Sequence, residues 1–392
     1  MPPHQATVQR PSHAPRPLTA DGVLTIDLGA VRANYRLMRE QARTAEVAAV
    51  VKANAYGLGA SHCASALLDE GCRTFFVAQL NEALELRRLL PADAAIYVLN
   101  GLPPGNEAEA AAAGIRPVLN SLEQVVAWAL LSTARNERLP AAIQVDTGMS
   151  RLGLSPREID HLIAERELLD WIDPVLLISH LACADDSNHP ANAEQLARFQ
   201  RLAAFLPGHK RSISNSGGAF LGAPFHSDMV RAGIALYGAN PSPGGPNPMR
   251  PVVRLDARVI QIRDIPAGTG VGYGLTHIAA DGMRLATLGI GYADGWPRSL
   301  SGRGHAYVNG IQVPIVGRVS MDSIVIDISA IGEGVLRAGD FVELLGPHQT
   351  LDDVARDAGT IPYEILTSLG HRFHRNYLNT PAAQAIDIAR LA

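Results

Sequence analysis

The stretch VVKANAYGLG, residues 50–59, places a lysine at the end of an apolar run that is typical of a buried strand. Tyr56 and two glycines follow within seven residues. Lys52 could extend its charged end into solvent. It could also act as a nucleophilic amine, provided that burial or neighbouring cations lower its pKa from about 10.4. The second interpretation requires other reactive groups around Lys52.

Polar side chains stand at the ends of the other apolar runs as well. They are Asn100, Asn120, Asp146, His180, the pair Asn215 and Ser216, and Arg231. A single histidine such as His180 more often has a structural role. Because barrel enzymes hold their active sites where the carboxyl ends of the strands meet, the set as a whole indicates an active site.

The elements that must position these residues are short strands alternating with helices. Helical apolar spacing marks stretches such as residues 30–42 and 81–90. The expected strands cover residues 48–52, 75–79, 95–99, 115–119, 142–146, 175–179, 212–216 and 228–232. Eight strands alternating with helices predict an α/β fold, a (β/α)8 TIM-type barrel. A doubly wound sheet is the alternative, but the G-x-G-x-x-G signature that would favour it does not follow the first strand.

A second domain is expected after the turn-rich stretch NPSPGGPNP, residues 240–248. The later runs have β-type patterns, and Asn309-Gly310 between two of them predicts a tight hairpin. We therefore expect a disordered tail over residues 1–21, a barrel over 22–250 and a mainly β domain over 251–392. The strand expected at 24–28 precedes the barrel and should join the β domain.

Two loops predict a phosphate site. SNSGGA, residues 214–219, follows the seventh strand, and RAGIALYG, residues 231–238, contains the end of the eighth. Small residues at a strand-to-helix turn expose backbone N–H groups toward an anion, and barrels often bind phosphate at this place. A phosphate beside a lysine suggests Schiff-base chemistry, either with a sugar phosphate, as in an aldolase, or with pyridoxal phosphate.

Composition excludes several classes of protein. Of 392 residues, 47% are apolar and 18% charged, and the net charge is −4, which gives no reason to expect nucleic acid or an anionic membrane as partner. The proline-rich first twenty residues lack the apolar core of a secretory signal. Three cysteines, Cys63, Cys72 and Cys183, fit no metal-ligand spacing and predict free thiols in a reducing compartment. We expect a cytoplasmic protein without a metal.

The ordered motifs between residues 22 and 378 resemble the alanine racemase family. They are VVKANAYGLG, VDTGMSRLG, SHLACADD, ISNSGGAFLG, MVRAGIALYG, GVGYGLT, IGYADGWPRSLSG, GRVSMDSIVIDIS and IPYEILTSLG. The resemblance implies a cytoplasmic homodimer that interconverts L-alanine and D-alanine with pyridoxal 5'-phosphate and supplies D-alanine for peptidoglycan.

The resemblance also implies a role for each matching residue. Lys52 would hold the cofactor covalently, and the other cofactor-binding residues would be Tyr56, His180, Asn215, Ser216, Arg231, Gly233, Ile234 and Tyr363. Arg151 and the backbone amide of Met321 would bind the substrate carboxylate, with Tyr292 at the entrance. Lys52 and Tyr273 would be the two catalytic bases. In this family Tyr273 and Met321 come from the neighbouring subunit, so the dimer would be the working unit.

Physical chemistry supports two bases, because one base cannot easily reach both faces of the α-carbon. A tyrosine acts as a base only if cations stabilise its phenolate, and a chain from His180 to Arg231 would do so. Arg231 itself would face the pyridine nitrogen, and a guanidinium keeps its proton, so the ring would stay largely neutral.

One position departs from a common family pattern. Many members carry a carbamylated lysine where this chain has Gln144, and the negative charge of that group orients the arginine that matches Arg151. We expect Gln144 to hold Arg151 by a hydrogen bond, with a bound chloride nearby, and the change leaves alanine specificity open. The alternatives are a broad-specificity amino-acid racemase, a decarboxylase of the same architecture and a non-catalytic barrel that carries the cofactor.

Overall fold

The computed structural model describes residues 19–204 and 210–380, so most of the tail expected over 1–21 lies outside the described residues. The chain divides into two compact units. The barrel unit comprises Ile26–Val253, Leu345–Leu369 and Tyr377–Ala392, and the β unit comprises Met1–Thr25, Arg254–Leu344 and Gly370–Asn376. Residues 345–369, which the sequence analysis assigns to the second domain, thus group with the barrel.

Eight strands pair in parallel to form the barrel. They are β2 (Glu46–Val50), β3 (Thr74–Val77), β4 (Ala95–Val98), β5 (Ile115–Leu119), β6 (Leu139–Gln144), β7 (Ile172–Ile178), β8 (Lys210–Ser212) and β9 (Met229–Ala232). Their order is β8-β7-β6-β5-β4-β3-β2-β9. Backbone N–H groups of Asp228 and Arg231 donate to the carbonyls of Arg211 and Ser214, each at 3.0 Å, so β9 also meets the chain around β8.

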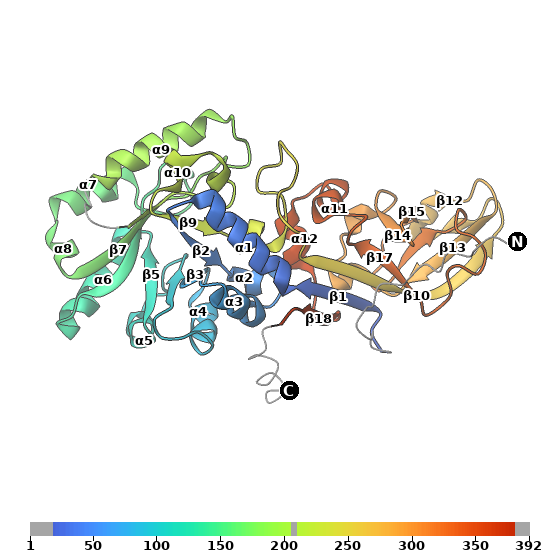
Figure 1. Cartoon of the computed structure of the whole chain (residues 1–392), viewed down its shortest axis with the longest axis horizontal. Coiled ribbons are helices and arrows are strands. Elements are labelled where there is room, and N and C mark those ends of the chain that lie inside the picture. The colour runs from blue at the N-terminus through green and yellow to red at the C-terminus, as the bar shows by residue number, and fades with distance from the viewer. Residues whose placement is uncertain (1–18, 205–209, 381–392) are drawn as a thin grey trace, which may run out of the picture. The chain divides into compact units, whose positions relative to one another are not determined.

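Helices follow most of these strands and lie outside them (Figure 1). They are α1 (Leu28–Ala42), α2 (Lys52–Tyr56), α3 (Ala60–Asp69), α4 (Leu80–Arg87), α5 (Glu107–Ala112), α6 (Leu122–Arg135), α7 (Pro156–Ala164), α8 (Glu167–Asp170), α9 (Pro190–Ala203) and α10 (Ala223–His226). Two 3₁₀ turns, η1 (Gly218–Phe220) and η2 (Ile234–Tyr237), and two later helices, α11 (Leu351–Ala358) and α12 (Pro362–Ser368), complete the unit. The predicted barrel is confirmed.

The seventh predicted strand is displaced. It was expected over residues 212–216, whereas β8 ends at Ser212. The polar side chains that follow are occupied by loop contacts: Ser214 donates to the Phe225 carbonyl at 2.7 Å, and Asn215 accepts from the Gly218 amide at 2.9 Å. The strand therefore ends at Ser212, and the polar residues after it form a loop at the barrel mouth.

Between the helices and the sheet lies an apolar layer. Trp128 of α6 and Phe199 of α9 are almost fully buried against strand residues such as Ile143 and Leu177. Burying a large aromatic side chain stabilises a fold by roughly 1.5–3 kcal/mol. This layer holds the strands, and therefore their carboxyl ends, in fixed positions.

The β unit is built from strands. They are β10 (Val253–Ile265), β11 (Gly270–Val271), β12 (His277–Ile278), β13 (Met283–Leu288), β14 (His305–Val308), β15 (Ile311–Val316), β16 (Ile324–Asp327), β17 (Phe341–Leu345) and β18 (His374–Leu378). The strands pair antiparallel in β10–β13, β11–β12, β13–β16, β14–β15, β14–β17 and β15–β16. Asn309 and Gly310 join β14 to β15 with φ of 51° and 83°, so the predicted hairpin is confirmed. Three 3₁₀ turns, η3 (Tyr273–Leu275), η4 (Tyr292–Asp294) and η5 (Arg298–Leu300), lie between the strands.

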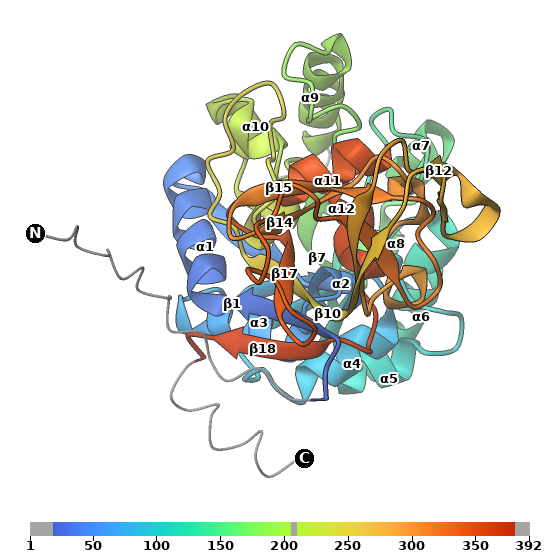
Figure 2. The same ribbon diagram turned by 90° about the vertical axis from the view of Figure 1, so that its right-hand side faces the viewer.

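The first strand, β1 (Gly22–Asp27), pairs with β10 and β18 in the sheet of the β unit (Figure 2). Its carboxyl end then caps α1, because the Asp27 carboxylate accepts from the amides of Gly29 and Ala30 at 2.8 and 3.1 Å. The strand that precedes the barrel thus finds its partners in the β sheet.

Two further features follow from the described part of the chain. Cys63 and Cys72 are buried, Cys183 is half-buried, and all three are free thiols. Within residues 19–204 and 210–380, no helix is long and apolar enough to cross a membrane.

Candidate active site

The predicted strand-end residues gather at the carboxyl end of the barrel strands. Asn100, Asn120, Asp146, His180, Asn215 and Ser216 follow their strands within a few residues, and Arg231 lies inside β9. Lys52 does not end its strand as expected: β2 stops at Val50, and Lys52 begins α2. Because the strands are parallel, these residues share one mouth of the barrel.

The turn after Lys52 is left-handed. Ala53, Asn54, Ala55 and Tyr56 have φ between 51° and 55°, and Gly57 ends the turn with φ of 82°. This conformation costs a residue other than glycine roughly 1–2 kcal/mol. Four such residues in a row persist only where surrounding contacts hold them, and such strain is concentrated at functional sites.

The Lys52 amine lies in an environment that disfavours its charge. Burial lowers its pKa, Arg151 and Arg231 lower it further, and Glu82 acts in the opposite direction. A lysine with a lowered pKa spends more time as the neutral amine, which is the form that attacks a carbonyl or accepts a proton.

Arg231 is almost fully buried, at 3% exposure, and is held by the neighbouring strands. Its guanidinium donates to the Ser212 carbonyl at 2.9 Å, to the Ser212 hydroxyl at 2.6 Å and to the Ser179 carbonyl at 2.6 Å. Burial lowers its pKa to about 10, so it still carries its charge at neutral pH. These bonds fix the direction of the cation, and no carboxylate of the described residues forms an ion pair with it.

His180 accepts a hydrogen bond from Arg231. The Arg231 guanidinium lies 3.3 Å from His180 Nδ1, and Asn215 Nδ2 lies 3.4 Å from His180 Nε2. Burial and the nearby Arg231, Arg151 and Lys52 lower the pKa of His180 to about 3. The imidazole is therefore neutral at physiological pH and has one ring lone pair. Since guanidinium can only donate, that lone pair belongs on Nδ1 and the proton on Nε2, so the contact between Nε2 and the Asn215 amide nitrogen is not a hydrogen bond in this tautomer.

The two predicted phosphate loops come together. The Ser216 hydroxyl accepts from the Gly233 amide at 2.9 Å and from the Ala235 amide at 3.3 Å, and Ile234 begins η2 between them. Several backbone N–H groups and a hydroxyl thus converge at the start of a helical turn, which is the donor set that binds phosphate.

Tyrosine rings close one side of this donor set. The Tyr56 ring packs against Tyr237 at 4.7 Å and Tyr363 at 5.9 Å. A Cβ added to Gly233 would lie 2.4 Å from the Tyr56 hydroxyl, so a larger residue at this position would displace one of the two groups. Burial raises the pKa of Tyr56, and burial with Asp185 raises that of Tyr363 to about 12, so both hydroxyls remain donors.

Two of the predicted polar residues have structural contacts instead. The Asp146 carboxylate accepts from the amides of Gly148, Met149 and Ser150 at 2.8–3.2 Å and shapes the loop after β6. Asn120 donates to the carbonyls of Leu99 and Val118. These bonds account for the Asp146 carboxylate and for the amide nitrogen of Asn120, whereas the buried Asn120 Oδ1 has no hydrogen-bond partner among the described residues.

The hydrogen bond expected between Gln144 and Arg151 is absent among the described residues. Gln144 is buried, at 8% exposure, in the last position of β6, whereas Arg151 is exposed on the loop that follows. The loop brings Arg151 close enough to lower the pKa of Lys52 and His180. Arg151 therefore belongs to the site by its charge, but Gln144 does not hold its side chain here.

The remaining predicted residues, Tyr273, Tyr292 and Met321, lie on the β unit with exposures of 73%, 42% and 52%. Tyr292 and Met321 occupy adjoining loops, since the Tyr292 amide donates to the Ser320 carbonyl at 3.0 Å and the Ala293 amide to the Met321 carbonyl at 3.0 Å. The three side chains are therefore accessible to a ligand or a partner, and two of them lie on loops that are hydrogen-bonded to each other.

Arg372 connects the Tyr292 loop to the Met321 loop, a role that the sequence analysis missed. Its guanidinium forms a bidentate pair with Asp294 at 2.7 and 2.8 Å and a third bond to Asp322 at 2.7 Å. Glu82, Ser179 and Ser212 were missed as well. A capping pattern marks Glu82 as a helix start, but no local signal reveals its contact with the turn after Lys52.

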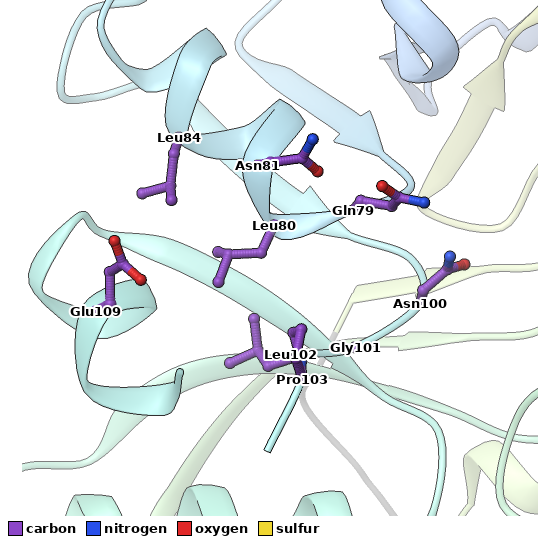
Figure 3. A pocket seen from close by; sticks show the side chains of 9 residues that line it. All are labelled: Gln79, Leu80, Asn81, Leu84, Asn100, Gly101, Leu102, Pro103 and Glu109. Atoms are coloured by element: carbon purple, nitrogen blue, oxygen red, sulfur yellow. The ribbon is translucent and has the colours of Figure 1, made fainter. Parts of the chain in front are cut away.

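A hollow of about 580 Å³ lies at the start of α4 and the loop after β4 (Figure 3). Leu80, Leu84, Leu102 and Pro103 form its apolar wall, and Asn100 is the predicted site residue that lines it. Lys52, His180 and Arg231 do not line it, so it does not belong to the reactive cluster. In the described ranges, no group of three or more His, Cys, Asp or Glu residues could hold a metal ion.

Comparison with known protein families identifies two matching segments. Residues 26–241 match the family described as "Alanine racemase, N-terminal domain", and residues 252–377 match "Alanine racemase, C-terminal domain". The first segment alone covers more than half of the chain.

Individual relatives agree with this match. "Alanine racemase, catabolic" of Agrobacterium fabrum is 56% identical over 359 residues, covering 92% of each chain. "Alanine racemase" of Brucella canis is 52% identical over 376 residues, covering 93% of this chain and 95% of that one. A crystal structure of alanine racemase from Bartonella henselae, with covalently bound pyridoxal phosphate, superposes with a TM-score of 0.89 at 48% identity, covering 92% of this chain and all of that one.

Proposed function

The chain belongs to the alanine racemase family and is thus a pyridoxal-phosphate-dependent isomerase; from this premise we propose that it interconverts L- and D-alanine with two opposed bases, Lys52 and Tyr273 of a partner subunit. The observation that carries the proposal is the arrangement at the barrel mouth. This mouth holds a lysine with a lowered pKa, a neutral histidine and an arginine that pairs with no carboxylate of the described residues. A cradle of backbone amides lies on the same barrel unit.

These residues fit the cofactor. Its phosphate needs neutral donors, which the Ser216 loop, the Gly233 turn and the tyrosine hydroxyls supply, and its aldehyde needs a neutral amine. The residues that would hold it are Lys52, Tyr56, His180, Asn215, Ser216, Arg231, Gly233, Ile234 and Tyr363. When bound, pyridoxal phosphate withdraws electron density from the substrate α-carbon and makes its proton removable.

The side chains of this chain then have to move one proton on each face. The lowered pKa of Lys52 prepares it to accept the α-proton of D-alanine. On the other face, Tyr273 would accept the α-proton of L-alanine, and the Nε2–H of His180 would stabilise its phenolate. Arg231 holds His180 through Nδ1 and keeps its own proton, so it can support the phenolate without exchanging protons.

The substrate carboxylate would be held by Arg151 and by the backbone amide of Met321, with Tyr292 at the entrance. Arg151 makes no ion pair with a carboxylate in the described residues, so its charge remains available. Tyr273 and Met321, both exposed on the β unit, are the residues expected from the second subunit, which makes a homodimer with shared active sites part of the proposal.

A subunit-mixing experiment tests the two bases and the dimer together. Lys52→Ala and Tyr273→Phe each remove one base and should be nearly inactive alone. If every site combines Lys52 of one subunit with Tyr273 of the other, half of the sites in each mixed dimer are intact. Random exchange of subunits should then restore about a quarter of the wild-type activity.

Matched readouts make the result decisive. Racemisation is followed by circular dichroism from each enantiomer, and α-proton release from deuterated L- and D-alanine is followed by NMR. Tyr273→Phe should slow release mainly from L-alanine, and Lys52→Ala should abolish the visible absorption of the bound cofactor. No recovery after mixing, when size measurements prove subunit exchange, would contradict the shared site.

Two enzymatic alternatives make different demands on the chain. A decarboxylase of this architecture would be expected to place a carboxylate at the ring nitrogen and a cysteine in the β domain, whereas Arg231 is held without a carboxylate and no cysteine follows Cys183. A broad-specificity racemase is distinguished by kcat/KM for serine and lysine, which for an alanine-specific enzyme should be at least about a hundredfold lower than for alanine.

For the metabolic role we propose supply of D-alanine for peptidoglycan, and a catabolic role is the second candidate. The names of two relatives, 56% and 54% identical, include the word "catabolic". Deleting the gene separates the two roles. D-alanine auxotrophy supports the first, and failure to grow on alanine with normal growth on other media supports the second.

A further inference from the structure

The Glu82 carboxylate joins three backbone amides that come from two different parts of the barrel unit. It accepts from Ala53 at 2.6 Å, from Ala78 at 2.8 Å and from Gln79 at 3.1 Å. Glu82 is the third residue of α4, so the bond to Gln79 completes an ordinary helix cap. The bond to Ala53 has no place in that cap, because it crosses 29 positions of sequence to the residue after Lys52.

The turn that receives this bond needs an outside acceptor. Helix starts leave their first backbone N–H groups without partners inside the helix. α2 begins after Val51, whose side chain has no atom that could accept a hydrogen bond, and Ala53 is the first of four residues in the left-handed region. Glu82 therefore takes the role of the missing cap from a neighbouring helix.

The position of this bond determines what it can control. Ala53 shares a peptide bond with Lys52, so fixing its amide fixes the direction in which the Lys52 side chain leaves the backbone. The charges that act on the Lys52 amine are those of Arg151 and Arg231, which oppose its protonation, and of Glu82, which favours it. His180, also close to Lys52, is neutral.

We propose that Glu82 is a positioning residue for Lys52: its carboxylate anchors the left-handed turn and places a negative charge near the lysine amine. Its two oxygens accept from the backbone amides of Ala53, Ala78 and Gln79, so it would act through the turn and not on the reacting atoms. The catalytic consequence rests on the proposed function, whereas the anchoring of the turn does not.

The test compares Glu82→Gln with Glu85→Gln. Glu85 lies on the same helix, is exposed and makes no bond in the described residues, so this variant controls for the loss of one charge. Glu82→Asp serves as a second variant, because it keeps the charge at the helix cap but is one methylene too short to reach Ala53.

Two readouts do not depend on activity. In the full-length protein freed of pyridoxal phosphate, the pH dependence of Lys52 acetylation, followed by mass spectrometry, reports the pKa of the amine. We expect it to fall in Glu82→Gln and to stay unchanged in Glu85→Gln, because only Glu82 faces the amine. Hydrogen exchange over residues 53–59 should accelerate by about tenfold or more in both Glu82 variants, the cost of losing a charge-assisted bond.

Activity supplies a third readout. If Lys52 is misplaced, proton removal from D-alanine becomes slower relative to removal from L-alanine, so the isotope effect with α-deuterated D-alanine should rise in both Glu82 variants. Unchanged Lys52 titration and unchanged exchange in these variants would overturn the proposal. If the wild-type protein has no racemase activity but the Lys52 titration still shifts in Glu82→Gln, the proposed function is refuted and the positioning role stands.

Discussion

Gly233→Ala places a single methyl group inside the proposed phosphate cradle. The added Cβ would lie 2.4 Å from the Tyr56 hydroxyl oxygen and 3.3 Å from the adjacent ring carbon. Carbon and oxygen normally approach no closer than roughly 3.4 Å, so the overlap is about 1 Å. One of the two groups has to move.

The Tyr56 ring has little room to retreat. It packs against Tyr237 and Tyr363, and its own backbone belongs to the left-handed turn. Overpacking of this kind costs about 1–3 kcal/mol of the free energy of unfolding. If the hydroxyl is displaced from the phosphate position, the lost bond to a charged group costs a further ~1.5–3 kcal/mol of binding, or about ten- to a hundredfold in the Kd of pyridoxal phosphate.

Two measurements on the same variant separate these effects. Urea unfolding without cofactor gives the stability loss, and a titration followed by visible absorption gives the Kd for pyridoxal phosphate. Gly244→Ala is the control, because no atom lies within 4 Å of its added Cβ. A Gly233→Ala protein that unfolds and binds the cofactor like the control would refute the assignment of this turn to the phosphate.

Three further changes test the rest of the site. The pKa of His180 is lowered to about 3, so between pH 6.5 and 3 the unfolded chain binds one proton more than the folded chain, and stability is lost as the pH falls through this range. In urea unfolding, His180→Gln should reduce the slope of stability against pH by up to about 1.4 kcal/mol per pH unit. Equal slopes in the variant and the wild type would exclude a buried neutral imidazole. Arg372→Ala removes the ion-pair partner of the buried Asp294 carboxylate, so it should lower stability by about 1–3 kcal/mol and raise the KM for alanine. Arg303→Ala, an exposed control, should change neither quantity. A KM equal to that of the control would show that the Tyr292 and Met321 loops keep their positions without Arg372. Arg231→Glu should slow racemisation and increase pyruvate formation by side transamination, and an unchanged ratio of the two products would contradict the role of this guanidinium.

Local patterns were sufficient for the fold. Strand and helix periodicities span few residues, so the apolar runs around residues 95–99 and 115–119 and the Asn309-Gly310 turn could be recognised without knowing their neighbours. A parallel arrangement then follows from the alternation of strands and helices, and with it the side of the barrel at which the strand-end residues meet.

Local patterns failed where a contact decides between two uses of the same side chain. Asp146 and Asn120 stand at strand ends like the reactive residues, but their hydrogen bonds to nearby backbone give them structural roles. Gln144 was expected to hold Arg151, yet one side chain is buried in β6 and the other is exposed on the loop. Such outcomes depend on angles and distances of a few tenths of an ångström, which residue spacing does not encode.

The sequence by itself therefore determined the family, the order of the elements and the lysine to which we assign the chemistry, because these follow from short-range periodicity and from motifs. Only the tertiary structure decided how that lysine is held. The left-handed turn is local, but the contacts around it are not: the Glu82 carboxylate reaches Ala53, and the Arg231 guanidinium binds Ser179 and Ser212, across 19 to 52 positions of sequence. Closure of the barrel brings such distant residues within hydrogen-bonding distance, and no local signal along the chain records that proximity.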